Sequence, residues 1–190
     1  MQNTLDMLAN IREHDSLRRH YTTIYNQCVV LLVSHFGSAL HDIFVAAAPK
    51  CLGRVTANEH EKETLKFSLS ELRDRNYDLR DVIGDILVTK SDISFQDMGS
   101  TLRAFERYCG ILISRDSSVN NIILAQAARH VIVHAGGKVD VKCTGQLRDA
   151  FPREVKRTLA VGDSLVFTPA EIDSIAASMR TFVGNIVTGM

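Results

Sequence analysis

The chain has 190 residues, of which 45% are hydrophobic and 23% are charged, the balance of an ordinary globular protein. Its 22 basic and 22 acidic side chains cancel, which argues against a protein that coats nucleic acid through bulk positive charge. A cleft that binds a few phosphates is compatible with a net charge of zero. The arginine-containing stretch 148–157 is a candidate for such a phosphate-binding segment. The length predicts one compact domain over residues 1–190.

The cysteines and the first residues bear on the cellular compartment. Cys28, Cys51, Cys109 and Cys143 form no CxxC pair, so we do not expect a zinc knuckle. Residues 1–8 lack a basic start followed by an apolar core, and we expect no apolar run near the roughly 18 residues that span a bilayer. These features predict reduced thiols in a cytoplasmic protein that does not associate with a membrane.

The first half of the chain is poor in helix breakers. Apolar residues at three- and four-residue spacing predict one long helix from Leu17 to Ala48, which Pro49 and Gly53 then break. A short separate helix is expected over residues 3–13, beginning at an Asn or Thr cap.

Three more segments, each a helix or a turn, are predicted in the middle of the chain. Residues 58–75 are charged with interspersed apolar residues, the pattern of a helix packed on the surface. Residues 78–87 form a weaker helix or a turn. Residues 97–108 predict a helix that Gly110 stops, as a glycine C-cap does.

The next strong helix is predicted over residues 117–134, with Ser117 or Ser118 as its cap and two glycines after its end. The β-branched residues 131–133 also suit a strand. The helical pattern before them and the glycines after them favour a helix.

The last helix has the clearest start signal. Thr168 as N-cap, Pro169 at the first position and Glu171 at the third make a capping box, and the helix should run to about Ile186. A short extended or hairpin segment is expected near residues 160–168. Together these elements predict an all-α protein, a bundle of five or six helices.

The segment 129–137, Arg-His-Val-Ile-Val-His-Ala-Gly-Gly, combines cationic and titratable groups at the end of an apolar helix. Arg129 and His134 are separated by about 140° around an ideal helix axis. They share a face only if the helix end is distorted, which the following glycines permit. His130 and His134 are four residues apart and do share a face.

These groups suit the cleavage of RNA by internal transfer. The reaction needs a base for the 2′-hydroxyl proton, an acid for the 5′ leaving oxygen, and positive charge at the phosphate. Histidine suits both proton transfers, and arginine binds phosphate through two N–H groups, so no metal or other cofactor is required. One Arg and one His make half of such a site, which gives a reason for a symmetric homodimer.

The segment resembles the signature of the HEPN superfamily, an Arg followed by a polar residue and then, after a few residues, by a His. Here Arg129, His130 and His134 fill these positions. The glycine-containing residues 135–140, and the stretch 162–167 before a capped helix, are also similar to HEPN groups. The RiboL-PSP branch or a neighbouring one is the most similar.

The resemblance implies a helical bundle whose motif helices meet in a dimer cleft. It implies a metal-independent endoribonuclease of a toxin–antitoxin or host-defence system, with RNA as substrate and an antitoxin or regulatory protein as a possible partner. Arg129 and His134 would be catalytic with support from His130, and we expect Lys138 and Glu106 to bind substrate. HEPN toxins silenced by a nucleotidyltransferase carry a Tyr where this chain has Gly136, which argues against that mode of control.

Simpler interpretations stand beside this one. Arg129 can form a surface ion pair with Asp140 or Glu106. His134 can simply stabilise the helix C-terminus through the helix dipole, an effect of about 0.3–1 kcal/mol. A zinc site on the two motif histidines is disfavoured because no Glu follows the first of them. The alternative function is an inactive HEPN-like module that binds RNA, a nucleotide or a protein.

Overall fold

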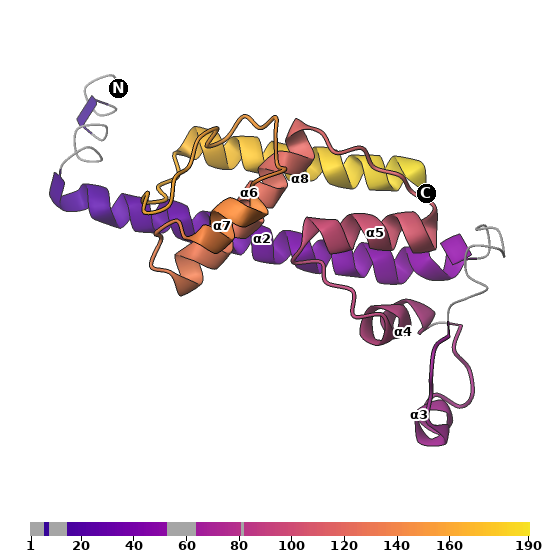
Figure 1. Ribbon diagram of the computed structural model, residues 1–190. Helices are drawn as coiled ribbons and strands as arrows, with labels where there is room; N and C mark the ends of the chain where they lie inside the picture. Colours follow the sequence, from indigo (N-terminus) through magenta and orange to yellow (C-terminus); the bar gives the residue numbers. More distant parts are fainter. Residues whose placement is uncertain (1–5, 8–14, 53–63, 81) are drawn as a thin grey trace. The chain divides into compact units, whose positions relative to one another are not determined.

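The computed structural model describes residues 6–7, 15–52, 64–80 and 82–190 (Figure 1). Within these ranges the chain is mostly helical, which confirms the predicted all-α class. The helices are α2 Asp15–Leu52, α3 Leu69–Asp74, α4 Ile83–Lys90, α5 Met98–Cys109, α6 Ser117–His134, α7 Val141–Gln146 and α8 Pro169–Gly189. The described part contains one isolated antiparallel bridge, between Lys138 and Ser164, and no longer strand.

The chain divides into two compact units. The first consists of Met1–Val33 and Asp116–Ser178, and the second of Ser34–Arg115 and Met179–Met190. Helices α2 and α8 therefore each contribute residues to both units.

Helix α2 confirms the long helix predicted from residue 17, but the expected end at Pro49 is wrong. The helix includes Pro49 and continues to Leu52. A proline lacks only its own backbone N–H, so Pro49 removes one helical hydrogen-bond donor from this turn. Ala48 and Cys51 on either side of it are buried, so their packing favours continued helix. Gly53 and the helix expected over residues 3–13 lie outside the described residues, apart from the helical residues 6 and 7.

Helix α2 also corrects an expectation about apolar runs. Between Tyr21 and His41 it carries no Asp, Glu, Lys or Arg. By length and composition alone the segment His20–Leu52 is able to cross a membrane, although 33% of its most apolar window is buried within the protein. The core helix of a soluble protein can have the same length and composition, so these two properties are weak evidence for a membrane.

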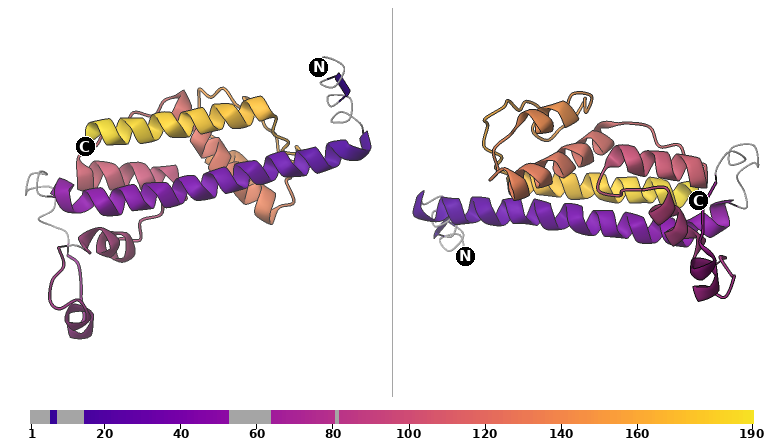
Figure 2. Two further views of the ribbon diagram at one scale, coloured as in Figure 1. Left: turned by 180° about the vertical axis from the view of Figure 1, so that it is seen from behind. Right: turned by 60° about the horizontal axis from the view of Figure 1, so that its bottom comes forward.

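The core of the second unit is a group of aromatic rings on α2, on α5 and in the segment before α5, and the two helices run side by side (Figures 1 and 2). The fully buried ring of Phe44 has its centroid 5.5 Å from that of Phe95, 5.6 Å from Phe105 and 6.0 Å from Tyr108. Helix α4 approaches α2 at Gly84, where an added Cβ would lie 2.5 Å from the Val45 carbonyl oxygen.

The predicted helix over residues 58–75 is wrong for residues 64–68, which are not helical. The helix α3 begins only after Ser68, whose hydroxyl and backbone N–H form a capping box with Glu71. The backbone turns through positive φ angles at Asn76 and Tyr77 soon after its end. Residues 58–63 lie outside the described part.

The remaining boundaries of the second unit follow their local signals. In the region 78–87, a turn precedes α4, which starts at Ile83. Helix α5 is capped by Asp97 and ends at Gly110, whose φ of 67° is left-handed, so the predicted glycine stop is confirmed.

Helix α6 has the predicted bounds, and its residues 131–133 are helical rather than extended. Its cap is Asp116 and not Ser117 or Ser118, since the Asp116 carboxylate accepts from the Val119 N–H at 2.8 Å. An aspartate carboxylate also complements the positive end of the helix dipole, which a serine hydroxyl does not.

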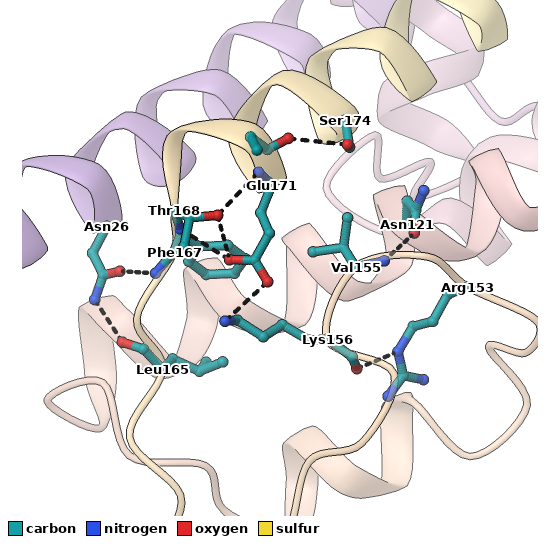
Figure 3. Close-up of polar contacts among 11 residues, drawn as sticks. Asn26, Asn121, Arg153, Val155, Lys156, Leu165, Phe167, Thr168, Glu171 and Ser174 are labelled. Atoms are coloured by element: carbon teal, nitrogen blue, oxygen red, sulfur yellow. Dashed lines mark hydrogen bonds and ion pairs between the residues drawn. The ribbon is translucent and has the colours of Figure 1, made fainter.

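Two buried asparagines hold the first unit together (Figure 3). Asn121 on α6 accepts from the backbone N–H groups of Glu154 and Val155, at 3.1 and 3.2 Å. Asn26 on α2 donates to the Leu165 carbonyl at 2.9 Å and accepts from the Phe167 N–H at 3.3 Å. The extended segment before α8 is therefore fixed to α2, and the predicted capping box of Thr168 and Glu171 follows it directly.

Replacing Asn26 with Leu should lower the free energy of unfolding by about 1–3 kcal/mol, because a buried carbonyl and a buried N–H lose their partners. Urea unfolding followed by circular dichroism measures this loss. The exposed neighbour Gln27 gives the matched control, Gln27→Leu, which should change stability little. Equal losses in the two variants would show that the asparagine does not hold the segment.

Candidate functional site

The predicted motif lies at the C-terminal end of α6, and the helix is regular to His134. The N–H groups of Ala135 and Gly137 both donate to the Val131 carbonyl, at 2.9 and 3.1 Å, and so close the helix. Gly136 and Gly137 have φ angles of 60° and 78°, which favour glycine. The two glycines therefore end the helix after the motif and do not distort the helix within the motif.

The chain beyond the glycines returns along the segment before α8. Lys138 pairs with Ser164 in the antiparallel bridge, and the Leu165 N–H donates to the Gly137 carbonyl at 2.8 Å. The segment expected to be extended near residues 160–168 forms one isolated bridge and no strand. It pairs with residues 137–139.

His130, His134 and Lys142 form a cluster that we call the histidine face. The two imidazole rings have centroids 4.9 Å apart, and the Lys142 Nζ lies 3.4 Å from the His130 Nε2. Because an ammonium group can only donate, the His130 Nε2 accepts this hydrogen bond. His134 is exposed at the end of the helix, so its imidazole is accessible to a ligand.

Lys142 was not predicted as a site residue, because the short helix α7 that carries it was not predicted either. Asp140 caps α7 by accepting from the Cys143 N–H at 2.7 Å. The glycines reverse the chain, and α7 then packs against α6. The only sequence signal was an aspartate in N-cap position after two glycines.

Arg129 lies half-buried on a different face of α6 from His134. Helical spacing places it with Ile132, three residues later. Ile132 lines a groove of about 450 Å³, whose other walls include the glycine turn and α2. The polar groups in this groove come from Thr22, Thr23, Asn26, Gln27 and Ser164.

The other two predicted site residues take different places. Lys138 is exposed just after the glycine turn, in the first unit. Glu106 is exposed on α5, in the second unit. Of the five predicted residues, the first unit brings His130 and His134 into contact, with Arg129 and Lys138 nearby in sequence.

The cysteines are all free thiols. Burial, together with the neighbouring thiol of Cys51, raises the pKa of Cys109 to about 12. Burial and then the Asp140 carboxylate raise the pKa of Cys143. Neither of these two thiols is suited to act as a nucleophile at neutral pH, because the thiolate is the reactive form. Among the described residues, no group of three or more His, Cys, Asp or Glu side chains is placed to hold a metal ion.

Comparisons of the chain with protein-family models, with curated proteins and with solved structures found no match. The likeness to HEPN proteins consequently stands on the sequence motifs alone.

Proposed function

We propose that this protein is a metal-independent endoribonuclease of the HEPN type that acts as a homodimer. The observation that supports this proposal most is the histidine face, in which an exposed imidazole packs against a second imidazole that a lysine contacts. It lies at the end of the helix that also carries Arg129.

The proposed reaction is an internal transfer. The 2′-oxygen attacks phosphorus, a bond forms between them, and the bond from phosphorus to the 5′-oxygen breaks. A neutral imidazole takes the 2′-hydroxyl proton, and an imidazolium gives a proton to the leaving oxygen. The products are a 2′,3′-cyclic phosphate and a 5′-hydroxyl end.

We infer different roles for the two histidines. The Nε2 of His130 is engaged by Lys142, so His130 is a positioning residue. His134 remains as the proton-transfer group. One chain then supplies one such group where the reaction needs two, and a second copy completes the site across a two-fold axis.

Arg129 would neutralise the charge that gathers on the phosphate. It diverges from His134 by about 140° around the axis of a regular helix. A single chain does not aim both groups at one point from the same face, which is a second reason for a composite site.

Incubation of the purified chain with a pool of RNA tests this function. We expect cleavage that persists in EDTA, products with cyclic phosphate ends, and a dimer in analytical ultracentrifugation at the active concentration. Cleavage that EDTA abolishes would contradict the mechanism. The absence of cleavage in every RNA pool would favour the alternative, a non-catalytic module that binds RNA, a nucleotide or a protein.

A further inference from the structure

The first unit contains a second pocket, of about 460 Å³, beside the end of α7. Its volume lies in the range of pockets that hold small ligands, about 300–1,000 Å³. Arg148, Arg153 and Arg157 line it, and Asp163 is the one carboxylate among its described lining residues. The Asp163 carboxylate already accepts from the Ala160 N–H at 2.8 Å. The pocket therefore has a clear excess of positive charge.

Arg153 is the buried cation of this pocket, with 5% of its surface exposed. Its guanidinium donates to three backbone carbonyls, those of Ala150, Lys156 and Arg157, at 3.1, 2.9 and 3.3 Å (the Lys156 contact is drawn in Figure 3). No described carboxylate forms an ion pair with it. Burial lowers the pKa of Arg153, the direction expected for a cation that water solvates poorly. An anion in the pocket would compensate this charge.

Phe151 gives the pocket an aromatic surface. The Arg153 guanidinium lies 4.2 Å from the centroid of its ring, yet 55% of the residue is exposed. The exposed part of the ring is accessible to a ligand in the pocket. Proteins that bind single-stranded nucleic acid combine such rings, on which bases stack, with arginines that bind the phosphate.

We propose that this pocket binds a nucleotide, with its phosphate on the exposed guanidinium groups of Arg148 and Arg157 and its base against Phe151. The ligand is either a free nucleotide or one residue of an RNA strand. None of the residues at the motif end of α6 lines this pocket, so the proposal goes beyond the catalytic one and does not depend on it.

The phosphate part is tested by titrating the full chain with AMP and with inorganic phosphate at low salt. The double variant Arg148→Ala/Arg157→Ala should weaken both affinities by a factor of about ten or more, since hydrogen bonds to charged groups are the strong ones. The matched control is Arg180→Ala, which removes an exposed arginine from the second unit and should leave both affinities unchanged. Circular dichroism checks that each variant is folded.

The base part is tested with Phe151→Ala. We expect AMP affinity to fall about fivefold to a hundredfold, the effect of losing one base–aromatic stack, while the affinity for inorganic phosphate stays the same. A short single-stranded RNA distinguishes the two sources of ligand, because a strand residue predicts tighter binding of RNA than of AMP. Binding of AMP and of inorganic phosphate is measured without a cleavage step, so this outcome is independent of whether the chain cleaves RNA.

Two results would overturn the proposal. One is that neither AMP nor phosphate binds at millimolar concentration. The other is that the double arginine variant binds as well as Arg180→Ala. The pocket would then be only a structural feature of the loop that Arg153 organises.

Discussion

Replacing His134 with Ala is expected to lower the rate of RNA cleavage by a factor of about 10²–10⁴, the usual contribution of a general acid or base. The side chain is exposed at the last residue of α6, so the fold should persist. The loss of a favourable helix-dipole contact should cost only about 0.3–1 kcal/mol of stability. Cleavage of a labelled RNA, with circular dichroism of the same samples, measures both effects.

A matched control for this variant is His35→Ala, which removes an exposed histidine of α2 in the second unit. It should cleave at the wild-type rate. Arg129→Ala should be as inactive as His134→Ala if the arginine stabilises the phosphate. Full activity of His134→Ala would remove the basis for the ribonuclease proposal.

Replacing Phe44 with Ala is expected to lower the free energy of unfolding by about 3–5 kcal/mol, as large-to-small changes of core aromatic residues do. The ring is fully buried and contacts three other aromatic rings. Its loss leaves a cavity between α2 and α5 that the surrounding helices can only partly fill. Urea denaturation monitored by circular dichroism gives the free energy.

The control for this change is Leu112→Ala in the same unit. Leu112 is 78% exposed, so its truncation should alter stability by no more than about 0.5 kcal/mol. Similar losses in the two variants would mean that the aromatic rings around Phe44 are not the core of the second unit.

The sequence predicted the helices that carry strong local signals. Apolar periodicity identified α2 and α6, Gly110 identified the end of α5, and the capping box at Thr168 identified the start of α8. Helix α7 was missed because six residues with one cap carry too little periodicity. The helix expected over residues 58–75 was predicted to start too early, because composition alone does not show that Ser68 is the N-cap and that α3 begins after it.

Only part of the candidate site could be predicted in the same way. The contact of His130 with His134 follows from helical spacing, which the sequence contains. The contact of Lys142 with His130 depends on the chain reversal at the two glycines and on the cap that Asp140 forms at the start of α7. The stretch 148–157 was identified by its arginines, but the burial of Arg153 is a result of loop packing that no local pattern encodes.

The reversal after α6 restricts how related chains can vary. The Lys142 ammonium reaches His130 across twelve sequence positions because two left-handed glycines and one aspartate cap set the direction of α7. Inserting one residue into α7 before Lys142 would rotate the lysine by about 100° around the axis of that helix. Nothing lies within 4 Å of a Cβ added at Gly136 or Gly137, so backbone conformation and not space selects glycine there. Homologues that keep this site should therefore preserve the length of the connection more strictly than the side chains within it.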